Sequence, residues 1–249
     1  MKILVLQHER IEHPGIFRRF LAEDGHSWHP VHLDEGEPVP DASHLAEFGA
    51  LWVMGGPMDV WQEDAHPWLC AEKALIREAV EGRGMAFLGL CLGHQLLAEA
   101  LGGKVRPSAR PEIGVMDVQL TEEGATSILF DDLPGRFACL QWHSAEVVQM
   151  PAGARCLATS PDCAVQAMGW GPRAYSVQFH IEIESDTVAG WAAIPEYAAA
   201  LDKAYGAGGA AALEAACAAR MPGFERLAER VYINWLQTSA QAAPAVARA

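Results

Sequence analysis

The chain has 249 residues, and its hydrophobic content of 51% is enough to bury the core of one large domain. Thirty-two acidic against 18 basic residues give a net charge of −14, and the basic residues are scattered, which argues against nucleic acid or an anionic membrane surface as a partner. Six cysteines without a C-x-x-C pair have no zinc-type spacing, and with no signal-peptide or membrane-span pattern they predict a cytoplasmic protein with free thiols.

The first hundred residues alternate apolar runs with helical patterns. Apolar runs without polar alternation are typical of parallel strands that are covered on both faces. The sequence predicts strands at residues 2–7, 28–33, 50–54 and 85–90. It predicts helices at 17–23 and 68–80, although Glu72 interrupts the apolar face of the second helix. This order indicates an α/β fold with a doubly wound, mostly parallel, flavodoxin-like sheet.

The second half begins with shorter segments that are typical of an antiparallel strand portion. The predicted strands are 113–120, 147–149, 155–158, 164–168 and 174–179, with a tight turn at Gly171-Pro172. From about residue 185 the chain is rich in alanine and predicts helices at 188–193, 197–205, 210–219 and 224–236, followed by fraying from Thr238. We therefore expect an α/β domain at 1–190, a C-terminal helical extension packed on it at 191–240, and a disordered tail at 241–249.

The most informative segment is Gly89-Leu90-Cys91-Leu92-Gly93, which directly follows a predicted buried strand and precedes a helical pattern. G-x-C-x-G is the thiol form of a nucleophile elbow, in which flanking glycines relieve crowding at a strained strand-to-helix turn. The N-terminus of the following helix favours a thiolate, and the N–H of Leu92 is left available for an oxyanion. The alternative is an inert buried cysteine beside two glycines.

A second segment, Gly55-Gly56-Pro57, ends another predicted strand. It brings a loop to the carboxyl edge of the sheet, where ligands of open α/β folds bind. The functional interpretation is a second oxyanion N–H from Gly56, in a turn set by Gly55 and Pro57. The alternative is an ordinary tight turn.

A third segment carries His180 and Glu182 immediately after a predicted strand. If the backbone stays extended, side chains two positions apart project to the same side, so Glu182 can orient the imidazole. A thiol nucleophile needs such a base, and the base needs an orienting acceptor. A histidine at a strand end is more often structural, but the three patterns together favour a thiol nucleophile.

At these residues the chain resembles the class I, triad-type glutamine amidotransferases, over roughly residues 1–190. The resemblance rests on Gly55-Gly56-Pro57, on the segment around Cys91, on Gln141-Trp142-His143-Ser144 and on Val177-Gln178-Phe179-His180-Ile181-Glu182. It implies that Cys91 attacks the γ-amide of glutamine, that His180 is the base and that Glu182 orients it. It also implies oxyanion donors at Gly56 and Leu92. The implied substrate-binding residues are Gly55, Gln95, Trp142, His143, Ser144 and Ala145.

One residue departs from the pattern of that family, which usually has His-Pro-Glu where this chain has Ile181. Isoleucine neither fixes φ nor removes an N–H, so the resemblance implies a less rigidly held triad. Two other families with this elbow fit less well. Intracellular proteases of this topology place a histidine after the cysteine, where Leu92 stands, and α/β-hydrolases place the acid before the histidine. His26, His29 and His32 are close in sequence, but nothing completes a metal site there.

These observations predict a thiol-dependent amidohydrolase that cleaves glutamine or a γ-glutamyl compound through a Cys91 thioester, as a hydrolase or transferase without a cofactor. The alternatives are a γ-glutamyl peptidase that acts alone and a non-catalytic regulator that binds a γ-glutamyl ligand. Neither a Ser-Gly-Gly nucleotide loop nor a G-x-x-x-x-G-K-[ST] motif is present, so ammonia would have to reach a separate synthetase subunit. The C-terminal helices could cover the site or form a homodimer face.

Overall fold

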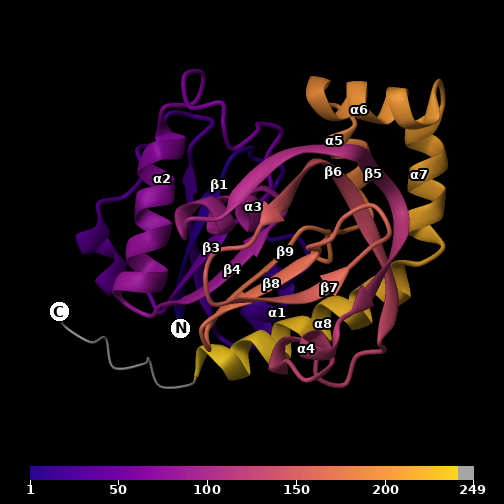
Figure 1. Cartoon of the computed structure of the whole chain (residues 1–249). Helices are drawn as coiled ribbons and strands as arrows, with labels where there is room; N and C mark the ends of the chain where they lie inside the picture. Colours follow the sequence, from indigo (N-terminus) through magenta and orange to yellow (C-terminus); the bar gives the residue numbers. More distant parts are fainter. Residues whose placement is uncertain (241–249) are drawn as a thin grey trace.

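The apolar runs of the N-terminal half form the parallel part of a nine-stranded sheet (Figure 1). The computed structural model describes residues 1–240. Five strands lie parallel in the order β2-β1-β3-β4-β9. Their bounds are β1 Lys2–Gln7, β2 Ser27–His32, β3 Ala50–Val53, β4 Ala86–Leu90 and β9 Ala174–Val177. The predicted doubly wound, mostly parallel sheet is confirmed.

Four antiparallel strands extend the sheet beyond β9, in the order β8-β7-β5-β6. They are β5 Lys104–Leu120, β6 Arg136–Gln149, β7 Ala154–Thr159 and β8 Ala167–Trp170. The prediction of a separate strand at 147–149 is wrong, because these residues are the end of the long β6. The start of β5 was also missed, since Pro107 and Pro111 interrupt its pattern and the register shifts between Pro107 and Glu112.

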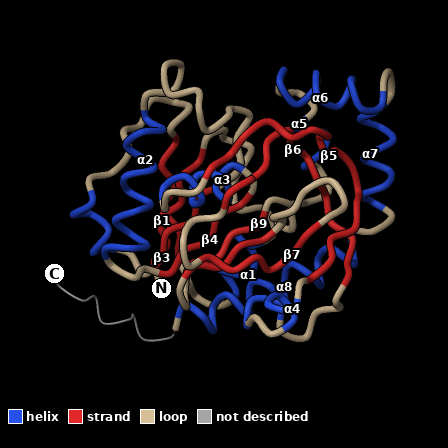
Figure 2. Tube along the Cα trace, in the orientation of Figure 1, coloured by secondary structure: helices blue, strands red, loops and turns tan. Residues whose placement is uncertain are grey.

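Helices cover both faces of the parallel strands (Figure 2). Ile3 and Val5 of β1 face a core shared with α1 (Phe17–Glu23) and α8 (Met221–Ser239), whereas Leu4 and Leu6 face α2 (Trp68–Arg77) and α3 (Leu92–Ala100). This alternation explains the continuous apolar run, because both faces of β1 are buried. The predicted helix at 68–80 ends earlier, in one π-helical turn at Glu78–Gly82.

Short helices complete the chain. Residues Ala42–Glu47 and Ile128–Phe130 form 3-10 turns, and α4 spans Glu122–Ala125. After β9 come α5 (Thr187–Trp191), α6 (Pro195–Tyr205) and α7 (Gly209–Ala218), which lie at one end of the molecule against β5 (Figure 1).

The last helix is longer than the sequence predicts. Fraying was expected from Thr238, but α8 continues to Ser239, and the buried Thr238 hydroxyl donates to the carbonyl of Trp235. The predicted disordered tail at 241–249 lies outside the described residues. Within residues 1–240, no helix combines the length and the apolar character needed to cross a bilayer.

Trp235 anchors α8 to the sheet. Its side chain is fully buried, its ring lies edge-on to Trp52 with centroids 5.0 Å apart, and its Nε1 donates to the carbonyl of Phe87 at 3.1 Å. We expect Trp235→Ala to lower the free energy of unfolding by about 3–5 kcal/mol, because it leaves a cavity in the core. Ile233→Ala, on the more exposed side of α8, should change it by roughly 0.5 kcal/mol or less. Equal urea midpoints for the two variants would contradict this role.

Candidate active site

The carboxyl ends of four neighbouring parallel strands meet at one edge of the sheet. His8 follows β1, Gly55 follows β3, Cys91 follows β4 and His180 lies beyond β9. Since β1, β3, β4 and β9 are adjacent, segments distant in sequence converge at the edge where open α/β sheets bind ligands.

Cys91 occupies a strained turn between β4 and α3. Its φ of 49° and ψ of −101° are rarely adopted by a residue with a side chain. The turn packs so tightly that a Cβ at Gly93 would lie 2.1 Å from the carbonyl oxygen of Val53, and one at Gly89 would lie 2.5 Å from that of Gly93. The G-x-C-x-G spacing therefore follows from steric exclusion on both sides of the cysteine.

His180 is tied to the sheet and to a carboxylate. Its backbone N–H donates to the carbonyl of Leu140 on β6 at 2.8 Å, and its Nδ1 lies 2.7 Å from Oε1 of Glu182. The backbone N–H of Ile181 donates to Oε2 of Glu182 at 2.9 Å. Proline could not make this last bond, so the departure from the family pattern gives the Glu182 carboxylate a second donor.

The surroundings of His180 favour the imidazolium. Burial alone would lower its pKa, but the charge of Glu182, the nearby Cys91 and the bond to Glu182 raise the pKa well above the usual 6.5. Nε2 is buried and makes no hydrogen bond of good geometry within residues 1–240, which leaves it available for exchange of a proton with Cys91. His94, by contrast, is held neutral because burial lowers its pKa to about 3.

Two glutamines connect the sulfur to the substrate-binding segment predicted on β6. Gln178 donates to Sγ of Cys91 at 3.5 Å, and its own oxygen accepts from Gln95 at 3.1 Å. Gln95 also donates to the carbonyl of Ala145 at 3.4 Å. Gln178 was quoted in the sequence motif but given no role, since its contact with Cys91 depends on the pairing of β4 with β9.

A cavity of about 100 Å³ opens at Cys91. Most of the predicted site residues line it, namely Gly56, Cys91, Leu92, Gln95, Trp142, His143, Ser144 and Ala145. Gly55, His180 and Glu182 are not among the lining residues and lie behind them. Three lining residues that the sequence did not identify come from α6, namely Glu196, Tyr197 and Ala200.

Aromatic side chains from the C-terminal helices close the site on the side of His180. The ring of Trp191 lies edge-on to the imidazole with centroids 4.4 Å apart. Trp142 contacts both Trp191 and Tyr197, with centroids 5.9 and 5.7 Å apart. No local pattern in the sequence distinguishes Trp191 or Tyr197 from ordinary core residues, because long-range packing of α5 and α6 brings them to the site.

Glu12 is a second buried carboxyl near the imidazole. Tyr197 donates its hydroxyl to Oε1 of Glu12. A Cβ at Gly55 would lie 1.9 Å from Oε2 of Glu12 and 3.5 Å from Cε1 of His180, so all three groups are packed together. Burial raises the pKa of Glu12 to about 7, although the charge of His180 opposes the rise.

A buried polar cluster supports His143. Glu112, His143 and Cys163 bring potential metal ligands within 4.8 Å of one another. The Glu112 carboxylate, however, already accepts from His143 at 3.1 Å, from Ser160 at 2.6 Å and from Gln166 at 2.5 Å. Burial alone would raise the pKa of Glu112, but these bonds lower it. Because both carboxylate oxygens are occupied, the cluster fits a structural support of the His143 ring.

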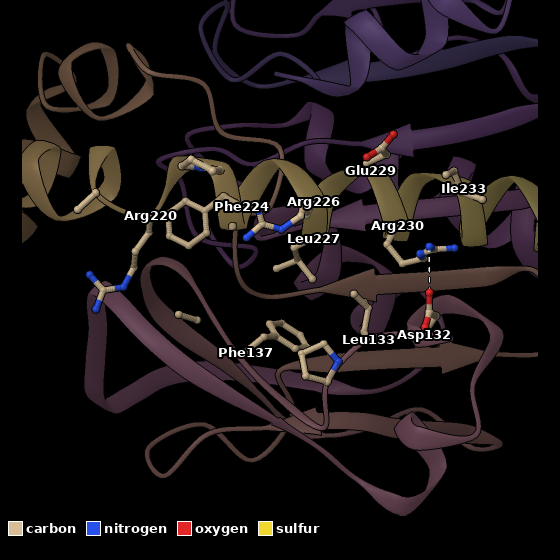
Figure 3. Close-up of a pocket in the computed structure, with 15 residues that line it drawn as sticks. Asp132, Leu133, Phe137, Arg220, Phe224, Arg226, Leu227, Glu229, Arg230 and Ile233 are labelled. Atoms are coloured by element: carbon tan, nitrogen blue, oxygen red, sulfur yellow. Dashed lines mark ion pairs between the residues drawn. The ribbon is translucent and has the colours of Figure 1, made fainter.

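A larger hollow of about 820 Å³ lies elsewhere, between α8 and residues 132–138 (Figure 3). Arg220, Arg226 and Arg230 line it, and Arg230 pairs with Asp132 at 2.9 Å. None of the predicted site residues belongs to this hollow, so its size does not make it the candidate active site.

Replacing Glu182 by glutamine tests the electrostatics of His180. The raised pKa means that the imidazolium stabilises the fold fully below the unfolded value near 6.5, and that this contribution is lost as pH rises through the raised value. Glu182→Gln removes the negative charge, so the pKa of His180 should fall in an NMR titration. The matched control is Glu184→Gln, which removes a surface partner of Arg18 and should leave that titration unchanged. An identical pKa in wild type and Glu182→Gln would contradict the assigned cause.

Comparison with known proteins places this site in a family. The model of glutamine amidotransferase class-I matches residues 19–189. The glutamine amidotransferase-like protein YfeJ of Salmonella typhimurium is 33% identical over 195 residues, which span 76% of this chain and 79% of that protein. A subunit of the glutamine-hydrolyzing GMP synthase of Sulfolobus acidocaldarius is 34% identical over 149 residues, or 59% of this chain and 74% of that one.

The structural comparison reaches further along the chain. The crystal structure of a glutamine amidotransferase from Thermotoga maritima superposes with a TM-score of 0.82 at 26% identity, and covers 97% of this chain and 99% of that one. The shared fold thus includes the C-terminal helices that supply Trp191 and Tyr197. The chain belongs to the class I glutamine amidotransferase family.

Proposed function

We propose that this protein hydrolyses the γ-amide of glutamine through a thioester on Cys91. The observation that carries the proposal is the position of Cys91, at a strained turn that opens into the cavity, with the His180–Glu182 pair directly behind it. In the first step the thiolate sulfur attacks the γ-carbonyl carbon. His180 then protonates the amide nitrogen, and the C–N bond breaks to release ammonia. In the second step His180 takes a proton from water, which cleaves the C–S bond and yields glutamate.

Two backbone amides are the proposed donors to the oxyanion. Leu92 is the first residue of α3, so its N–H has no acceptor within the helix. A Cβ on Gly56 would lie 2.8 Å from Cδ2 of Leu92, which puts the two residues side by side at the cavity. Neither amide donates to a backbone or side-chain acceptor among residues 1–240. Preformed donors of this kind stabilise the charge that develops during acyl transfer.

The size and charge of the cavity support a small γ-glutamyl substrate. A volume of about 100 Å³ lies well below the roughly 300–1,000 Å³ of sites for drug-sized ligands. Asp59 and Glu196 among the lining residues favour an α-ammonium group by charge. Trp191 and Tyr197 close the side of the imidazole, where the leaving group receives its proton, and this favours ammonia over a larger amine.

The C-terminal helices also bear on the question of a partner. Tyr197 and Ala200 of α6 line the cavity, so walls of the site come from the same chain. This supports hydrolysis by the chain without an added protein. Transfer of the ammonia to a separate synthetase is a further proposal, prompted by the similarity to GMP synthase, and it does not change the chemistry at Cys91.

Removing the nucleophile tests the proposed chemistry. Cys91→Ala should lower ammonia release from glutamine by roughly 10⁴-fold or more, because no thioester can form. Cys70→Ala, at an exposed thiol, should keep the wild-type rate. Undiminished hydrolysis by Cys91→Ala would exclude the thioester. Binding of glutamine without turnover by the wild-type protein would favour the non-catalytic regulator.

A substrate panel separates the glutaminase from a γ-glutamyl peptidase. Glutamine should be the best substrate, ahead of glutathione, γ-glutamyl ethylamide and γ-glutamyl p-nitroanilide, because the aromatic wall leaves little room for the leaving group. Tyr197→Ala should raise kcat/KM for the anilide relative to glutamine by about 10-fold or more. Tyr197→Phe keeps the ring and should leave that ratio unchanged. Wild-type protein that prefers the anilide or glutathione would support the peptidase instead.

A further inference from the structure

A buried ion pair lies behind the Gly55–Gly56 loop and has no part in the chemistry described above. Nε2 of His8 is 2.9 Å from Oε1 and 3.1 Å from Oε2 of Glu72, and both side chains are fully buried. Nδ1 of His8 is 2.8 Å from the carbonyl oxygen of Gly55. The pair explains why a carboxyl group interrupts the apolar face of α2, since Glu72 points at a histidine and not at the hydrophobic core.

The partners of His8 determine its protonation. A carboxylate and a carbonyl oxygen are both acceptors, so the ring must donate from both nitrogens, and only the imidazolium can do so. Burial opposes this charge, but the charge of Glu72 and the bonds to Glu72 and Gly55 raise the pKa of His8 above its usual value. Trp68 stacks on the ring with centroids 5.3 Å apart, which fixes its plane.

The bond to Gly55 fixes the direction of the next amide. A trans peptide is planar, and its C=O and N–H point in opposite directions. Because His8 holds the Gly55 oxygen on one side, the N–H of Gly56 must point to the other. Gly56 lines the cavity at Cys91, whereas Gly55 does not.

This loop has a particular need for such a constraint. A Cβ on Gly56 would lie 2.8 Å from Cβ of His8 and 2.7 Å from Sδ of Met58, so a larger residue cannot occupy the position. A peptide between two glycines is, however, the least hindered of all peptides against rotation of its plane. Glycine is therefore required for space, and another group must supply the orientation.

We propose that His8, held in place by Glu72, is a positioning residue that locks the Gly55–Gly56 peptide with the Gly56 N–H directed at the oxyanion. This inference rests on the proposed function, because it assumes acyl transfer at Cys91. It assigns to His8 and Glu72 a catalytic effect that acts through the backbone, without contact with the substrate.

Variants of His8 test the lock. His8→Leu removes the donor to Gly55 and should lower kcat for glutamine by about 10²–10³-fold, the cost of one lost oxyanion donor, with little change in KM. His8→Asn puts an amide N–H near the position of Nδ1 and should recover a large part of kcat. Since His8→Leu strands a buried carboxylate, His8→Leu combined with Glu72→Gln gives the same test without the unpaired charge. Glu72→Gln alone should stay close to wild type, because its amide can donate to Nε2 and leave Nδ1–H on Gly55.

Two probes distinguish the lock from a general loss of structure. The aldehyde 5-oxopentanoate reacts reversibly with a thiolate to form a C–S bond and an oxyanion, so its inhibition constant should rise in parallel with the loss of kcat. Iodoacetamide alkylates sulfur with loss of iodide and forms no oxyanion, so its rate at Cys91 should stay at the wild-type value. The inference is overturned if the double variant keeps full kcat, or if alkylation and kcat fall together. Hydrolysis that persists in Cys91→Ala would instead refute the proposed function and leave the peptide geometry untouched.

Discussion

The strained turn at Cys91 is the constraint on which the rest of the site depends. A side chain at φ of 49° is costly, roughly 1–3 kcal/mol, and persists only where the surrounding structure determines it. Here β4 is paired with β3 and β9, and the glycines at 89 and 93 pack without a Cβ against backbone atoms. The same pairing brings Gly56 and His180 to the sulfur, since each follows a strand next to β4 or close to it. The site is therefore a consequence of strand order as much as of the individual side chains.

Local requirements in this molecule could be predicted from its sequence, and long-range ones could not. The glycine spacing around Cys91 and the two-residue spacing of His180 and Glu182 are local, so both were found, as was the parallel sheet. The lengths of β5 and β6 were missed because prolines and partly exposed residues hide their pattern. His8, Glu12, Trp191 and Tyr197 come to the site through tertiary packing. Only Glu72, a charge on an apolar helix face, carried a signal in the sequence, and it could not indicate its partner.

The helices after residue 190 are parts of the same structure as the sheet. Trp235 of α8 lies in one core with Ile3 and Phe17, and Tyr197 of α6 reaches both the cavity and Glu12. The catalytic groups are thus enclosed by a layer that the N-terminal strands alone would leave open. Enclosure strengthens electrostatic interactions, which explains why His180 can hold a charge in the interior when Glu182 is its partner.

The central claim is that glutamine becomes bonded to Cys91, and trapping the intermediate tests it most directly. Wild-type protein mixed with glutamine, quenched in acid within the first turnovers and digested, should yield the peptide that contains Cys91 with a γ-glutamyl group on sulfur, which hydroxylamine removes. Ammonia release at the wild-type rate with an unmodified Cys91 peptide at every quench time, or with the γ-glutamyl group on another residue, would contradict the account.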